Sequence, residues 1–170
     1  MELFIVRHGI AQEREEFPSL CDEERALTDE GRTKTRQVAR ALKKLGCRPE
    51  RIGTSPLRRA DETARIIAKV ICPEAEMEAC DFLKPGGDPR EAIRWLRNLD
   101  DPRPVGVMIV GHMPDVAELA GVLLVSRAEI NIVFKKAGVC CISFEGQPAA
   151  GAGVLEWLMQ PAQMQSLAES

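Results

Sequence analysis

The sequence lacks the features that would place the chain in a membrane or on a nucleic acid. Its longest apolar run, Val105–Val110, is interrupted by Gly106 and is far shorter than the roughly 20 residues of a membrane-spanning helix. The formal net charge of -3 gives no general excess of cations to neutralise the phosphates of DNA or RNA. The first residues also lack the basic start and small-residue cleavage site of a secretory signal. We therefore expect a cytoplasmic protein with neither membrane nor nucleic acid as a partner.

Metal-binding and disulfide patterns are scarce as well. Six cysteines are present, but no two have the Cys-x-x-Cys spacing, and the chain contains only two histidines, far apart in sequence. In a reducing compartment such cysteines are ordinary buried or surface thiols. We expect neither a disulfide framework nor a zinc site.

What the sequence does contain is an alternation of apolar strand-like segments with helical segments. The 170 residues fit one domain, 1–170, with no internal repeat or dividing linker. Alternation of this kind predicts a layered α/β fold with a mostly parallel sheet. Strands are expected at Glu2–Val6, Arg51–Ser55, Glu76–Cys80, Val105–Val110, Val139–Glu145 and Val154–Met159. Helices are expected at Thr28–Leu45, after Pro56 through Ala68, at Asp88–Asn98, Asp115–Leu124 and Pro161–Ser170. The polar, acidic and aperiodic segment Ile10–Arg25 is predicted to be a loop that could flank a site.

Each of the two histidines follows a predicted strand and stands beside a glycine. Arg7-His8-Gly9 follows the first strand, and Gly111-His112 follows Val105–Val110. Ligands of open α/β sheets gather at the carboxyl ends of the strands. A single histidine is more often structural than catalytic, but this paired placement predicts a shared site.

A third segment, Thr54–Thr63, brings arginine to another strand-to-helix junction. Arg58 and Arg59 fall in the predicted first helical turn, where a cation opposes the helix dipole unless an anion is near. A bound phosphate would remove that conflict. The alternative is that both arginines are simply solvated.

Together these segments resemble the histidine phosphatase superfamily, whose hallmark is the Arg-His-Gly triplet. Arg7-His8-Gly9 comes first, a Ser-Pro-x-x-Arg-Ala-x-x-Thr pattern follows at 55–63, and Gly111-His112 comes late in the chain. The resemblance implies a phosphoglycerate-mutase-like, three-layer α/β/α sandwich. Within the superfamily, the chain looks most like the SixA-type protein phosphohistidine phosphatases. Three segments carry this likeness: Leu27–Gly31, Leu83–Asp88 and the Gly-His-Met-Pro segment at 111–114.

The resemblance also implies roles for particular residues. His8 is the expected nucleophile, and the groups expected around the phosphoryl oxygens are Arg7, Gly9, Arg59 and His112. A neutral imidazole can attack phosphorus near pH 7, and two nearby arginines would lower the pKa of His8 and bind oxygens as forks. A bound phosphate dianion would in turn favour a protonated His112. On this reading no metal and no other cofactor is needed.

One departure from the family concerns the acid that protonates a leaving group. Many members that act on phosphate esters carry a glutamate just before the segment matching Leu83–Gly86, where this chain has Phe82. Asp81 or Asp88 could substitute, although Asp88 is more simply read as a helix N-cap. A phosphohistidine needs less acid assistance, because the conjugate acid of imidazole has a pKa of about 6.5. The departure therefore favours phosphohistidine on a protein, such as a phosphotransfer domain, as the substrate.

Arg58, at a variable motif position, is expected at the surface or as an auxiliary contact with that protein.

Two other functions stay open at this point. The chain could be a small-molecule phosphomonoesterase that acts on a sugar phosphate or nucleotide. It could also be a non-catalytic phosphoprotein-binding module that keeps the pocket without turnover.

Overall fold

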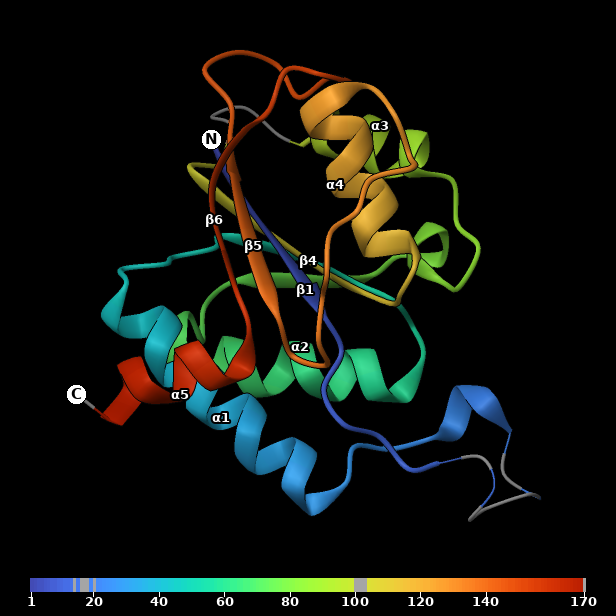
Figure 1. Cartoon of the computed structure of the whole chain (residues 1–170), viewed down its shortest axis with the longest axis vertical. Helices are drawn as coiled ribbons and strands as arrows, with labels where there is room; N and C mark the ends of the chain where they lie inside the picture. Colours follow the sequence, from blue (N-terminus) through green and yellow to red (C-terminus); the bar gives the residue numbers. More distant parts are fainter. Residues whose placement is uncertain (14, 16–18, 20, 100–103, 170) are drawn as a thin grey trace.

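The strands of the computed structural model, which describes residues 1–13, 15, 19, 21–99 and 104–169, form one mixed sheet (Figure 1). They are β1 (Glu2–Arg7), β2 (Arg51–Thr54), β3 (Glu76–Ala79), β4 (Gly106–Gly111), β5 (Val139–Ser143) and β6 (Val154–Met159). Their order across the sheet is β3-β2-β4-β1-β5-β6. The first four in this order are parallel, whereas β5 and β6 are antiparallel to their neighbours. The mostly parallel sheet predicted from the sequence is confirmed, with an antiparallel pair added at one side.

Helices cover both faces of this sheet (Figure 1). On one face lie α1 (Asp29–Lys44), α2 (Arg58–Ile71) and α5 (Pro161–Glu169), and on the other lie α3 (Pro89–Arg97) and α4 (Asp115–Val125). Two short 3₁₀ helices, η1 (Asp22–Glu24) and η2 (Asp81–Leu83), lie in connections. The expected three-layer α/β/α sandwich is confirmed. In the described ranges, none of the helices has the length and apolar character needed to cross a membrane.

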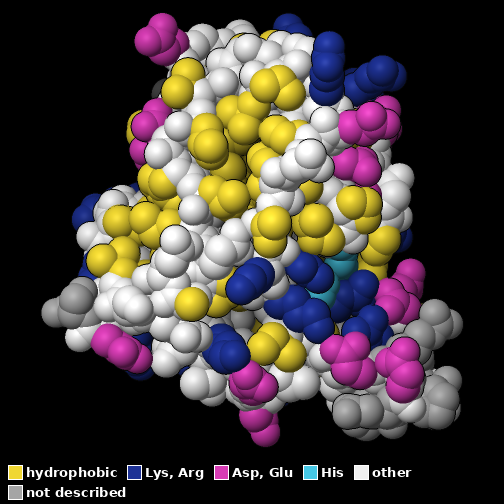
Figure 2. Space-filling view, in the orientation of Figure 1, with side chains coloured by type: hydrophobic (Ala, Val, Ile, Leu, Met, Phe, Trp, Pro, Cys, Tyr) yellow, Lys and Arg dark blue, Asp and Glu magenta, His cyan; other side chains and the backbone are white. Residues whose placement is uncertain are grey.

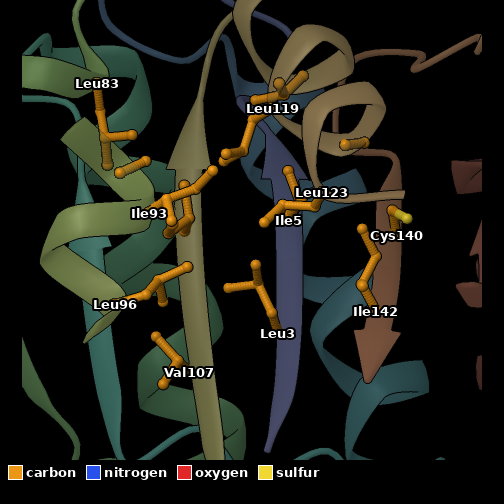
Figure 3. Close-up of a cluster of buried hydrophobic side chains, with 14 of the residues drawn as sticks. Leu3, Ile5, Leu83, Ile93, Leu96, Val107, Leu119, Leu123, Cys140 and Ile142 are labelled. Carbon is orange, nitrogen blue, oxygen red and sulfur yellow. The ribbon is translucent and has the colours of Figure 1, made fainter. Parts of the chain in front are cut away.

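The central strand β1 is buried on both faces, which explains its unbroken apolar sequence. Leu3 and Ile5 are buried in the cluster beneath α3 and α4 (Figure 3), while Phe4 and Val6 are buried in the cluster beneath α1, α2 and α5. Successive side chains of a strand point to opposite faces, so a strand covered on both sides is apolar at every position. Each methylene buried in this way contributes roughly 0.8 kcal/mol, so β1 is a firmly held support for the residues that follow it.

Most element boundaries agree with the sequence pattern to within two residues. Thr28 is the N-cap of α1 and accepts a hydrogen bond from the Gly31 N–H at 3.0 Å, and Gly46 follows the helix with a φ of 77°. Strand β5 ends at Ser143 rather than Glu145, because Ser143 pairs with the first residue of β6 and the ladder stops there. The predicted loop contains η1, and positions 14, 16–18 and 20 lie outside the described residues.

The parallel pairing of β1 with β4 determines where the two histidines meet. Arg7 is in register with Gly111, so the residues that follow both strands leave the sheet at the same edge. The His8 N–H donates to the Gly111 carbonyl at 3.0 Å. The N–H of Ser55, which follows β2, donates to the Val110 carbonyl at 2.9 Å. Three chain segments far apart in sequence are thereby fixed to one another by backbone hydrogen bonds.

Candidate active site

The two histidines lie against each other at the carboxyl edge of the parallel strands. Their ring centroids are 5.1 Å apart, with the ring planes tilted by 55°. Both are largely withdrawn from solvent, with 8% of His8 and 3% of His112 exposed. In the space-filling view the histidines are surrounded by Lys and Arg side chains (Figure 2). The two histidines therefore lie together, as their placement after parallel strands predicted.

Each imidazole is oriented by one hydrogen bond. His8 Nδ1 lies 2.7 Å from the carbonyl oxygen of Gly9, which can only accept, so Nδ1 carries the proton and Nε2 keeps its lone pair. His112 Nε2 lies 2.8 Å from the hydroxyl of Ser55. In the sequence, Ser55 has no predicted role beyond its place in the motif. The structure identifies it as the group that orients His112.

Both imidazoles are neutral at neutral pH. The pKa of His8 is lowered to about 3, mainly by burial, with the positive charges of His112, Arg59 and Arg7 lowering it further against one backbone hydrogen bond that raises it. The pKa of His112 is lowered to about 4 by burial and by Arg59, while the negative charge of Asp22 opposes the shift. The arginines act in the direction expected from the sequence, but loss of water is the larger cause.

Arg59 comes from the first turn of α2 and is almost fully buried, with 5% exposed. Its Nη1 donates to the backbone oxygen of Asp22 at 2.7 Å, and its Nη2 to the carboxylate of Asp22 at 3.0 Å. Burial alone would raise the pKa of Asp22, but the hydrogen bond from Arg25 and the charge of Arg59 outweigh it, so that pKa is lowered. Asp22 was missed in the sequence, where it was one acid among many in an aperiodic loop.

Arg7, the last residue of β1, is held from the opposite side. Its Nη1 donates to the carbonyl of Phe134 at 2.7 Å. Burial lowers the pKa of Arg7, as expected for a cation whose contacts in the described residues include no carboxylate. Phe134 lies in the segment before β5, for which the sequence predicted neither a helix or strand nor a role.

Gly9 has a packing role that the sequence did not reveal. A Cβ at this position would come within 2.7 Å of the Thr35 hydroxyl, which is too close for any larger residue without rearrangement. The Gly9 N–H donates to Thr63 Oγ1 at 3.0 Å, and Thr63 Oγ1 in turn donates to the Arg59 carbonyl at 2.6 Å. Gly9 thus ties the end of β1 to α2, and its observed contacts fix His8 and Arg59 relative to each other.

Among the described residues, three buried side-chain atoms have no hydrogen-bond partner: Arg7 Nε, His112 Nδ1 and Asp115 Oδ2. Leaving such an atom unpaired costs about 1–3 kcal/mol, so the two nitrogens next to His8 are most simply explained as groups that a ligand satisfies. Together with Arg59 they can bind an anion. No group of three His, Cys, Asp or Glu side chains suited to a metal ion occurs in the described ranges.

The remaining candidates lie apart from this group. The Asp81 side chain is 85% exposed and pairs with Lys84 at 2.8 Å, and Asp88 caps α3 by accepting from the Arg90 N–H at 2.9 Å. Within the described part of the chain, no hydrogen bond or ion pair connects either aspartate to His8 or His112. Arg58 is exposed and pairs with Glu62 at 2.9 Å, as expected for a surface residue.

Comparisons with known proteins agree with this geometry. An uncharacterized protein of Picosynechococcus sp. is 36% identical over 140 residues, which is 82% of each chain. Phosphohistidine phosphatase SixA of Escherichia coli is 26% identical over 164 residues, 96% of each chain. The structure of the protein histidine phosphatase SixA complexed with tungstate superposes with a TM-score of 0.84 at 26% identity, covering 96% of this chain and 99% of that one.

A family model matches the first part of the chain. The model of the histidine phosphatase superfamily, branch 1, matches residues 3–83, which hold Arg7, His8 and Arg59. The solved SixA structure extends the likeness to the second half, where His112 lies. The chain belongs to the histidine phosphatase superfamily and is SixA-like in sequence and fold.

Proposed function

We propose that this chain is a phosphatase that transfers the phosphoryl group to His8 and then releases it to water, and that its substrate is phosphohistidine on a protein. The observation that carries the proposal is the buried pair of neutral imidazoles, 5.1 Å apart, next to Arg7 and Arg59. Family membership and the likeness to SixA support phosphatase chemistry.

His8 supplies the nucleophile. Its Nδ1–H donates to the Gly9 carbonyl, so the Nε2 lone pair is free to attack phosphorus without a separate base. A bond forms between Nε2 and phosphorus, and the bond from phosphorus to the substrate nitrogen breaks. The departing imidazole takes up a proton from solvent. Water then attacks phosphorus, the bond to Nε2 breaks with its electron pair returning to His8, inorganic phosphate leaves, and the proton released by the attacking water passes to solvent.

Arg7, Arg59 and His112 supply the charge that the transferring group requires. Arg7 Nε and His112 Nδ1 are buried without partners in the described residues. Arg7 Nε–H can donate to a phosphoryl oxygen at neutral pH, and His112 Nδ1 can do so when it carries a proton. A bound dianion would raise the pKa of His112 and favour that protonation. The related SixA was solved in complex with tungstate, a tetrahedral oxyanion like phosphate, which supports the proposal that this chain binds such an anion.

The substrate class follows from the leaving group. Asp81 faces solvent beside Lys84 and Asp88 caps a helix, so neither has the contacts of an acid poised over His8. An alkoxide leaves poorly without such an acid, whereas an imidazole with a conjugate-acid pKa of about 6.5 needs little help. This difference supports phosphohistidine over a phosphate ester.

Trapping the intermediate tests the mechanism. Brief incubation with a 32P-phosphohistidine protein, followed by denaturation, should leave acid-labile label on the wild-type chain and none on His8→Ala. Turnover that persists in His8→Ala would rule out His8 as the nucleophile. Wild-type protein that binds phosphate but never acquires label or releases product would instead favour the non-catalytic binding module.

A small-molecule phosphomonoesterase is the second candidate. The low exposure of His8 and His112 favours it, because a phosphate on a slender ester reaches a buried pair more easily than one on a protein surface. Values of kcat/KM measured side by side on a phosphohistidine protein and on sugar phosphates and nucleotides decide between the two. A clear preference for an ester would reject the protein substrate.

A further inference from the structure

A groove of about 440 Å³ starts at Arg7, next to the catalytic pair, and extends to the beginning of α5. Three further cations line it: Lys34 of α1, and Lys135 and Lys136 from the segment before β5. In the space-filling view, basic side chains continue outward from the histidines on this face (Figure 2). The proposed phosphatase mechanism uses Arg7 alone of these four cations.

The lysine-bearing segment is fixed to the catalytic strand. The Ala137 N–H donates to the carbonyls of Arg7 and His8 at 3.1 and 3.0 Å. The side chain of Gln160 accepts from the Lys135 N–H at 2.9 Å and donates to the Val133 carbonyl, which joins this segment to the end of β6. Lys135 and Lys136 are thus carried on a backbone segment that is hydrogen-bonded to the end of β1, next to His8.

The charges of the groove are only partly balanced. Lys34 pairs with Glu30 at 2.6 Å and Lys136 with Glu13 at 2.9 Å, and both acids are more than half exposed. Exposed pairs of this kind contribute little and exchange readily for other acidic partners. Lys135 is exposed, and its ammonium group has no ion pair with the described residues. A ligand that brings carboxylates can therefore satisfy charges that the chain itself leaves open.

We propose that this groove binds acidic side chains next to the phosphohistidine of a protein substrate. The inference rests on the proposed function. A small ester would fill the space between Arg7, Arg59 and His112 and leave the lysines unused, whereas a polypeptide continues past the phosphorylated residue into the groove. Complementary charge there would raise the rate of productive encounter and select among phosphohistidine proteins.

Two synthetic peptides and one small molecule test the proposal. Each peptide carries a single phosphohistidine, flanked in one by Glu and Asp and in the other by Gln and Ser. Free phosphohistidine measures the chemistry alone. We expect the wild type to hydrolyse the acidic peptide with a kcat/KM roughly tenfold above that of the neutral peptide at low salt, and this preference should shrink in 0.5 M NaCl.

The variant Lys135→Glu should reduce the preference for the acidic peptide roughly three- to tenfold while leaving the kcat/KM for free phosphohistidine unchanged. The matched control is Arg90→Glu, an equal change of charge on the exposed start of α3, in the opposite helical layer. It should leave all three substrates unaffected.

Two different results would count against these ideas. Equal kcat/KM values for the two peptides, or a preference that Lys135→Glu leaves intact, would overturn the groove as an acidic binding site while leaving the phosphatase in place. Hydrolysis of esters with no hydrolysis of the free or peptide-borne phosphohistidine would overturn the proposed substrate class and the groove together.

Discussion

The two halves of the sheet differ in what they contribute to the site. The parallel strands β1, β2 and β4 are followed directly by His8, Ser55 and His112, and Arg59 begins the helix after β2. The groups proposed for the chemistry therefore leave from one edge. The antiparallel pair β5 and β6 contributes neither histidine. Its flanking segments supply Lys135 and the clamp from Gln160. Under the proposed function, chemistry and substrate selection are therefore assigned to separate parts of one sheet, and substitutions in each part test that assignment.

The largest expected effect is loss of the nucleophile from the parallel half. His8→Ala removes the atom that accepts the phosphoryl group, so kcat should fall by at least about 10⁴-fold. Rapid-quench and steady-state phosphate release on free phosphohistidine measure the loss.

The control for His8→Ala is folding and anion binding. The variant should keep the circular dichroism spectrum of the wild type and still bind tungstate, because Arg7 and Arg59 remain. Residual activity within tenfold of the wild type would mean that another group attacks phosphorus and that the parallel half does not hold the chemistry as described.

Replacing the buried arginine should come next in size. Arg59→Lys keeps the charge but loses the planar fork, and Asp22 would hold the shorter-reaching ammonium less well. We expect kcat to fall roughly 10²- to 10³-fold, as when one preorganised donor to a developing charge is lost. Arg58→Lys, one residue earlier and exposed, is the matched control and should change kcat less than twofold. Similar losses in both variants would contradict the separate roles given to the two arginines.

The origin of these roles was only partly visible in the sequence. The strand pattern was sufficient to predict that His8 and His112 meet, because parallel strands place their carboxyl ends together. The partner of Arg59 was not predictable, since Asp22 stands 37 residues away in a segment without periodicity. Ser55 and Thr63 were recognised as part of the sequence motif, but their hydrogen bonds depend on how α2 packs against β1. The local sequence pattern therefore predicted which residues of the proposed site meet, whereas the hydrogen bonds that hold them depend on tertiary packing.

Acid should destabilise the fold through the histidine pair. The folded pKa values of His8 and His112, about 3 and about 4, lie below the ordinary 6.5, so below pH 6.5 the unfolded chain takes up protons that the folded chain does not. The stability these groups confer is complete above pH 6.5 and is lost as the pH falls toward 4. Together, the two histidines should lower the free energy of unfolding by about 3 kcal/mol between pH 7 and pH 5.

Urea unfolding at a series of pH values measures this loss. The double variant His8→Asn/His112→Asn is the control, because it removes both titrating groups and should show a shallower decline over the same range. Parallel declines in the wild type and the double variant would mean that other groups cause the acid sensitivity. Added tungstate should reduce the wild-type decline, since a bound dianion favours a protonated His112.

A smaller effect is expected from the carboxylate that holds Arg59. Asp22→Asn removes a negative charge that repels the incoming dianion but keeps the backbone oxygen that accepts from Arg59. Inhibition by tungstate should become roughly three- to fivefold tighter, the size typical of one partly exposed charge. Glu23→Gln, an exposed neighbour within η1, makes the same charge change and should leave the inhibition constant unaltered. Weaker inhibition in Asp22→Asn would show that holding Arg59 in place outweighs the repulsion.

The smallest effect should come from the antiparallel half. Gln160→Ala breaks the side-chain bonds to Val133 and Lys135, and two modest exposed hydrogen bonds together contribute about 1 kcal/mol to the free energy of unfolding. The lysine segment would then be held less closely, so the preference for an acidic phosphohistidine peptide should fall about twofold while hydrolysis of free phosphohistidine stays the same. Gln147→Ala, exposed in the turn between β5 and β6, is the control. A loss of turnover on free phosphohistidine in Gln160→Ala would show that the antiparallel half also positions the chemistry, because the same segment bonds to Arg7 and His8 through Ala137.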